Sequence, residues 1–62
     1  MIVQDILSKT ANGSVKIIIW KYETGEIILQ TIWHNLISEE LKAKEVESVC
    51  IRDYEIRLGV AD

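Results

Sequence analysis

One stretch of the sequence decides the fold: Val15-Lys16-Ile17-Ile18-Ile19-Trp20-Lys21-Tyr22, followed by Glu23-Thr24-Gly25 and residues 26–34. β-Branched and aromatic residues in such a run are typical of a strand. A three-residue loop ending in glycine is typical of a hairpin, because glycine supplies the positive φ of a bulge. The stretch therefore predicts two antiparallel strands, residues 15–22 and 26–34.

Two short helices are predicted on either side of this hairpin. Apolar residues at helical spacing predict a helix over residues 2–9, and Asn12-Gly13 predicts a reversal after it. Ser38 is a favourable N-cap for a second helix over residues 39–45.

A second hairpin follows. β-Branched and alternating apolar residues predict strands over 46–51 and 54–60, with Arg52-Asp53 as a two-residue turn. The order of elements is then α-β-β-α-β-β. It predicts a small α+β domain, a mainly antiparallel four-stranded sheet with the two short helices against one face.

Size and composition favour association. The chain has 62 residues, which is room for one domain over residues 1–62. A chain of this size buries only about 60% of its unfolded surface and is marginally stable alone. One cysteine, Cys50, excludes an internal disulfide, and one histidine, His34, disfavours a structural zinc site. Because 48% of the residues are nevertheless hydrophobic, we expect a homo-oligomer or a partner-binding surface and no cofactor or metal.

The charge is acidic and unevenly distributed. Ten acids against seven bases give a net charge of −3, which disfavours direct binding of nucleic acid. The excess lies in residues 32–62, which hold seven acids and four bases. It predicts either a binding face or a solvated surface that keeps the protein soluble; as a binding face it would form an acidic rim of Glu39, Glu40, Glu45 and Glu55. No apolar run could span a membrane and the N-terminus does not resemble a signal peptide, so we expect a cytoplasmic protein without a membrane partner.

The registers of the two hairpins predict which faces are apolar. Pairing across Glu23-Thr24-Gly25 places Ile18 opposite Gln30 and Trp20 opposite Ile28. Both faces of this hairpin are then apolar, one with Ile18, Trp20, Tyr22, Ile28 and Ile32, the other with Val15, Ile17, Ile19, Ile27, Leu29 and Trp33. The second hairpin, with Ile51 opposite Tyr54, is apolar on one side only: Val49, Ile51, Tyr54, Ile56 and Leu58. We expect the core between Val15, Ile17, Ile19, Leu29, Val49, Ile56, Leu58 and the helices.

The Trp20 side of the first hairpin has no predicted cover. An uncovered apolar patch with aromatic residues is typical of an interface or a ligand groove. The candidate contact residues are Trp20, Tyr22, Ile28, Ile32, Trp33 and His34. The structural alternative is that the sheet curls and Trp20 closes a second, minor core.

No pattern of catalytic residues is present. A nucleophilic pair of Cys50 with His34 lacks a third orienting group, and Cys50 is more typical of a small, partly buried residue. His34 is more typical of a surface or interface histidine than of a pH switch. There is no phosphate-binding glycine loop and no nucleophile elbow. We therefore expect that the protein is not an enzyme.

Four short motifs together form a recognisable layout: Val3, Asp5, Ile6 and Leu7 in the first helix, Thr24-Gly25-Glu26 at the turn, Val46-Glu47-Ser48, and the alternating Tyr54, Ile56, Leu58 and Val60. This layout resembles that of short accessory proteins of phages and mobile elements of Gram-positive bacteria. The resemblance implies a non-enzymatic binder that inhibits a host defence component stoichiometrically.

Three functional hypotheses follow. The first is a homo-oligomeric protein that binds a host protein, as a phage anti-defence factor would. The second is an oligomeric sponge for a small nucleotide-like molecule, with Trp20 or Trp33 stacked on a base and His34, Lys16 or Arg57 near phosphate. The third is a structural or assembly subunit.

Overall fold

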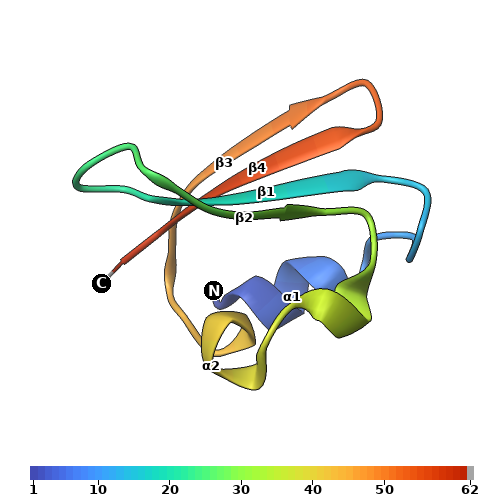
Figure 1. Ribbon diagram of the computed structural model, residues 1–62, viewed down its shortest axis with the longest axis horizontal. Coiled ribbons are helices and arrows are strands. Elements are labelled where there is room, and N and C mark those ends of the chain that lie inside the picture. Colours follow the sequence, from blue (N-terminus) through green and yellow to red (C-terminus); the bar gives the residue numbers. More distant parts are fainter. Residues whose placement is uncertain (62) are drawn as a thin grey trace.

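The computed structural model describes residues 1–61, and these form one sheet with helices on one side (Figure 1). The elements in chain order are α1 (Val3–Leu7), β1 (Lys16–Lys21), β2 (Ile27–Thr31), the 3-10 helix η1 (His34–Leu36), α2 (Glu39–Lys42), β3 (Val46–Arg52) and β4 (Glu55–Val60). The predicted order α-β-β-α-β-β and the α+β class are confirmed.

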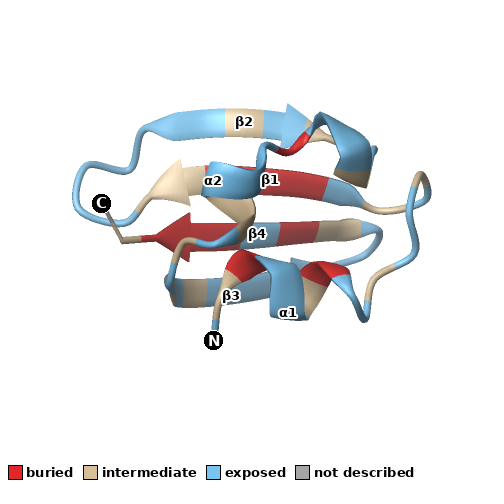
Figure 2. Cartoon of the chain, turned by 90° about the horizontal axis from the view of Figure 1, so that it is seen from below, coloured by how far each residue is buried: buried red, intermediate tan, exposed pale blue. Residues whose placement is uncertain are grey.

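The sheet has the strand order β2-β1-β4-β3. Both hairpins are antiparallel, and they join through β1 and β4, which are parallel to each other. The two remaining strands, β2 and β3, are therefore the sheet edges, and the chain crosses between them through η1 and α2 (Figure 2). The prediction of a mainly antiparallel sheet is confirmed, with one parallel pair at its centre.

The first hairpin keeps the predicted register over most of its length. Ile18 lies opposite Gln30, and Gly25 has the positive φ, 77°, that the loop was expected to need. The register shifts between Ile19 and Trp20, so that Trp20 lies opposite Ile27 and not Ile28. The returning strand ends at Thr31, before the predicted His34, because the chain turns into η1.

The second hairpin turns later than predicted. Arg52 pairs with Glu55, so the turn is Asp53-Tyr54 and not Arg52-Asp53, and Tyr54 has a φ of 56°. Ile51 consequently lies opposite Ile56, not Tyr54. The slip amounts to two residues in the pairing, which is the period of side-chain alternation in a strand, so the division of the two faces survives it.

The core lies between the sheet and the helices (Figure 2), and its buried residues are Val3, Leu7, Ile17, Ile19, Ile37, Ile56, Leu58 and Val60. Most of the predicted core residues are among these or pack against them. Val49 is the exception: it was expected in the core and is 46% exposed. It lies on the edge strand β3, beyond the reach of the helical layer.

Both helices are shorter than predicted. α1 ends at Leu7, where Ser8 is the C-cap, and α2 ends at Lys42, where Ala43 is the C-cap. α2 ends at Lys42 because the segment that follows it pairs with the backbone at the start of the chain. The Val3 amide donates to the Lys44 carbonyl at 3.0 Å, and the Val46 amide donates to the Met1 carbonyl at 2.9 Å. This short ladder also covers the first part of the β3 edge.

Candidate functional site

The sheet face away from the helices, named the open face, carries Trp20 and Tyr22, as predicted. Their rings are 5.9 Å apart and tilted by 35°. Trp20 lies opposite Gly59 of β4, and its indole covers that glycine so closely that a Cβ there would meet Trp20 Cζ2 at 2.8 Å. Ile18 is only 5% exposed although it faces away from the helices. The predicted alternative therefore holds in part: Trp20 helps to close a small second core.

A shallow groove of about 300 Å³ remains on this face, lined by Ile18, Trp20, Gly25, Ile27, Cys50 and Arg57. Ile27 lies here because of the register shift, and not on the helix side where it was expected. Cys50 is exposed, not partly buried as expected, because β3 is an edge strand and nothing packs over it on this side.

Three of the other candidate contact residues lie just beyond the end of β2: Ile32, Trp33 and His34. The fourth, Ile28, is the second residue of β2 and is 37% exposed. Trp33 rests against the reversal before β1, where a Cβ on Gly13 would meet Trp33 Cζ3 at 2.5 Å. The His34 amide donates to Asn12 Oδ1 at 3.0 Å, and His34 Nε2 is buried without a hydrogen-bond partner. The six residues Trp20, Tyr22, Ile28, Ile32, Trp33 and His34 therefore do not form one cluster, because β2 separates Trp20 and Tyr22 from the last three.

The four glutamates do not form a continuous rim. Glu39 pairs with Lys42 at 3.5 Å, and Glu45 pairs with the terminal amine at 3.2 Å. Glu55 belongs to the open face, where Arg57 Nε donates to Glu55 Oε2 at 2.9 Å. This hydrogen bond holds the pKa of the Glu55 carboxyl below its ordinary value, against the smaller effect of desolvation. Glu40 is exposed on α2, on the helix side of the sheet.

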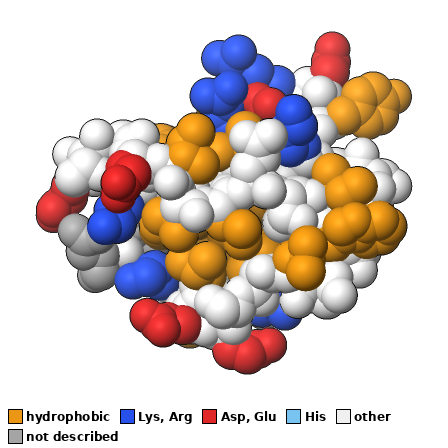
Figure 3. Space-filling model, viewed as in Figure 1, with side chains coloured by type: hydrophobic (Ala, Val, Ile, Leu, Met, Phe, Trp, Pro, Cys, Tyr) orange, Lys and Arg blue, Asp and Glu red, His pale blue; other side chains and the backbone are white. Residues whose placement is uncertain are grey.

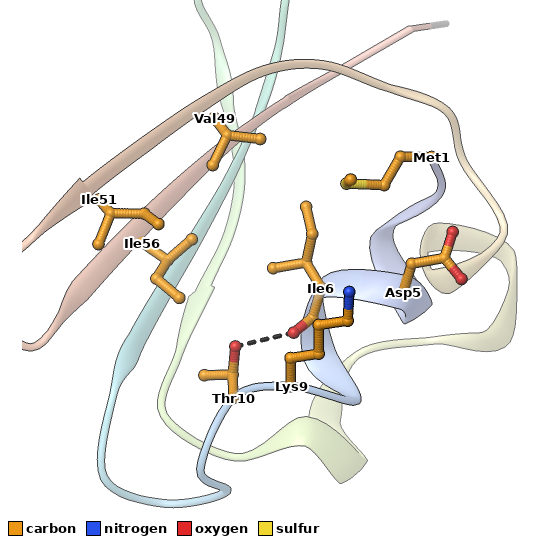
Figure 4. A pocket seen from close by; sticks show the side chains of 8 residues that line it. All are labelled: Met1, Asp5, Ile6, Lys9, Thr10, Val49, Ile51 and Ile56. Carbon is orange, nitrogen blue, oxygen red and sulfur yellow. Dashed lines mark hydrogen bonds between the residues drawn. The ribbon is translucent and has the colours of Figure 1, made fainter.

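A second groove, of about 340 Å³, lies on the helix side between α1 and β3 (Figure 4). We name it the α1–β3 groove. Its apolar side chains point toward one another across the hollow, from the start of the chain, α1, β3 and β4: Met1, Ile6, Val49, Ile51 and Ile56. Three polar residues complete the lining: Asp5, Lys9 and Thr10.

Helix length explains this groove. α1 has five residues and α2 has four, which is too little to cover four strands. The helix-facing side chains of β3 are left exposed: Ile51 is 73% exposed and Val49 is 46% exposed. The groove was not predicted, because the helices are shorter than the spacing of apolar residues indicates. The sequence signal for it is the low helical content relative to a four-stranded sheet.

The described residues, 1–61, hold no group of metal ligands. No three His, Cys, Asp or Glu side chains gather within this range as metal ligands would. No helix within it is long and apolar enough to cross a membrane. The two residues considered for nucleophilic chemistry are on separate elements, Cys50 in β3 and His34 in η1.

Comparison with known proteins finds no match: no protein-family model, no curated protein and no solved structure matches the chain. The resemblance to accessory proteins of phages and mobile elements therefore stays a prediction. The function is therefore inferred from the geometry of two apolar surfaces, the open face and the α1–β3 groove.

Proposed function

We propose that this chain is a non-enzymatic protein-binding module, and that its α1–β3 groove takes an amphipathic helix of a partner protein. The observation that carries the proposal is the incomplete helical layer beneath β3. Exposed apolar side chains that line one continuous hollow are typical of interaction sites, whereas scattered ones are not. Ile51 and Val49 on the strand meet Met1 and Ile6 in such a hollow (Figure 4).

The shape of the groove favours a helix as the occupant. A packed helix is about 10 Å across, which is close to the thickness of the layer that α1 and α2 already form on the sheet. A helix laid beside α1 and under β3 would therefore complete the layer. Its apolar residues would recur at i, i+3, i+4 and i+7, as in other helix-in-groove complexes.

The polar residues of the groove favour an acidic partner helix. The Asp5 carboxylate already accepts a hydrogen bond from the Ile2 amide at 2.9 Å. Lys9 is exposed at the rim and, among the described residues, belongs to no ion pair. A glutamate beside the apolar stripe of the partner would meet this cation.

A stoichiometric inhibitor needs a binding surface and no catalytic centre. We therefore propose that the partner protein is a component of host defence, which this chain blocks by binding to it.

The nucleotide-sponge hypothesis receives less support. Arg57, which lines the groove beside Trp20, is paired with Glu55, and His34 Nε2 is buried. Of the three side chains expected near phosphate, only Lys16 remains, and it lies four residues before Trp20 on the same strand.

The test uses a fluorescently labelled helical peptide with leucines at i, i+3, i+4 and i+7 and glutamates beside them. The control peptide has the same composition with the leucines scattered. Fluorescence anisotropy is expected to show saturable binding of the first peptide only. Ile51→Lys should weaken binding at least tenfold, whereas Tyr54→Lys, an exposed apolar residue of the same hairpin outside the groove, should leave it unchanged.

Two results would overturn the proposal. One is equal binding of the striped and scattered peptides, since the groove would then not distinguish a helix with one apolar face from a helix without one. The other is binding that Ile51→Lys does not weaken. If neither peptide binds but nucleotides quench tryptophan fluorescence with saturation, the sponge hypothesis replaces this one.

A further inference from the structure

The edge strand β2 is apolar, uncharged and uncovered. Residues 27–33, Ile-Ile-Leu-Gln-Thr-Ile-Trp, contain no charged side chain. Ile27 is 58% exposed and Trp33 is 50% exposed. In Figure 3 hydrophobic side chains gather in a band over β2 and the chain that follows it, and charged side chains lie around the margins. Proteins usually protect such an edge with charge, proline or a covering segment, because it otherwise pairs with another strand.

The opposite edge of the same sheet has this protection. β3 carries Glu47 and Arg52, and its first residues are paired with the start of the chain through the bridge between Ile2 and Glu45. The contrast between the two edges indicates that β2 is the edge that pairs with a further strand.

The backbone of β2 has groups available for that pairing. On β1, the amides of Lys16 and Tyr22 donate to carbonyls on the β4 side, whereas the Lys21 amide donates to the Glu26 carbonyl at 2.8 Å, on the β2 side. Alternate residues of an antiparallel strand direct their amide and carbonyl groups to the same side. Leu29 and Thr31, which lie opposite Ile19 and Ile17, therefore face β1. The amide and carbonyl of Gln30, between them, point outward, away from β1.

We propose that β2 pairs antiparallel with β2 of a second copy of this chain, about a two-fold axis at Gln30. The two copies of Gln30 then exchange both backbone hydrogen bonds across the axis. Gln30 lies opposite its own copy, and Ile28 lies opposite Ile32. This pairing joins two copies of the chain, and it does not depend on whether the α1–β3 groove binds a helix.

In a two-fold interface each residue near the axis meets its own copy or a close neighbour of it. Charges of one sign would therefore repel one another there, as Glu47 would if two β3 edges met. An uncharged edge has no such repulsion, so β2 is the edge of this sheet that fits itself. The flanking Ile27 and Trp33 extend the apolar contact beyond the paired residues.

The dimer would have one continuous eight-stranded sheet. Because the two-fold axis is perpendicular to the sheet, the helices of both copies lie on the same face. The two β3 strands are then seven strand spacings apart, about 34 Å at about 4.8 Å each. The assembly would present two α1–β3 grooves on one side.

The test measures the mass of the native protein by native mass spectrometry and light scattering over a hundredfold range of concentration. We expect a concentration-dependent monomer–dimer equilibrium. Gln30→Glu and Gln30→Lys each place two like charges at the axis and should each shift the dimer dissociation constant upward at least tenfold. Mixing the two variants should restore the dimer as a heterodimer, which the mass identifies.

Cys50→Glu is the matched control, because it adds the same charge to an exposed position of the other edge strand. It should leave the equilibrium unchanged. A monomer at every concentration would overturn the proposal, and so would a dimer that neither Gln30 variant weakens, since it would form through another surface. Far-UV circular dichroism confirms that each variant is folded, and restoration in the mixture excludes misfolding as the cause of a lost dimer.

Discussion

Replacing Gly59 by alanine tests how Trp20 closes the open face. Gly59 is buried in β4, and its backbone needs no positive φ, so alanine fits the strand conformation. The obstacle is the indole: a Cβ would lie 2.8 Å from Trp20 Cζ2 and 3.0 Å from Cε2. The ring must then tilt away from β4.

The expected cost follows from two opposing effects. Overpacking of a filled site costs about 1–3 kcal/mol. Alanine in place of glycine within a strand gains about 0.5–1 kcal/mol from backbone entropy. The net loss is about 0–2.5 kcal/mol of unfolding free energy, with about 1 kcal/mol at the middle of the range, out of the roughly 3–9 kcal/mol expected for a domain of this size.

A double-mutant cycle with Trp20→Ala separates the contact from other effects. Urea denaturation followed by far-UV circular dichroism gives the four unfolding free energies, at a concentration where the protein is monomeric. Once the indole is removed, Gly59→Ala should change sign and stabilise by about 0.5 kcal/mol. If Gly59→Ala costs the same with and without Trp20, the indole does not cover Gly59 and the reasoning is refuted.

Other substitutions test the core, the ion pair and the helix cap. Leu58→Ala, at a fully buried site, should cost about 2–5 kcal/mol in urea denaturation, whereas Ile51→Ala should stay within about 0.5 kcal/mol; equal costs would contradict the uncovered edge at β3. Arg57→Gln should raise the pKa of Glu55 toward its ordinary value in a carboxyl ¹³C NMR titration. Because the folded pKa is lowered, the pair stabilises above the ordinary carboxyl pKa, and that contribution is lost as the pH falls through the lowered value; the variant should lose this dependence. Ser38→Ala should cost about 0.5–2 kcal/mol by thermal denaturation, since Ser38 Oγ accepts from the Leu41 amide at 3.2 Å; no change would exclude this cap.

Local patterns were enough to predict the elements and their order. The run of β-branched residues at Ile17–Ile19 and the glycine at position 25 determine the first hairpin, and each acts over a few residues only. The strand order, with β4 placed beside β1, involves contacts between distant segments. The sequence predicted only that the two hairpins share one sheet, because their apolar faces must form one core.

The candidate site was harder to predict because it depends on element ends. A difference of a few residues in α1 and α2 decides whether Val49 is covered. A shift of one residue between Ile19 and Trp20 decides that Ile27, and not Ile28, lies opposite Trp20. Trp20, where the register shifts, also packs on Gly59 of β4, a contact between distant segments that no local pattern reports.

The most direct test of the proposed function is a methyl NMR titration of the protein with the leucine-striped helical peptide. Isoleucine and valine methyl groups report on both apolar surfaces in one spectrum. The account predicts shifts at Ile6, Val49 and Ile51, in the α1–β3 groove, with Ile18 and Ile27 on the open face unchanged. Shifts confined to Ile18 and Ile27 would contradict it and would place the binding site beside Trp20.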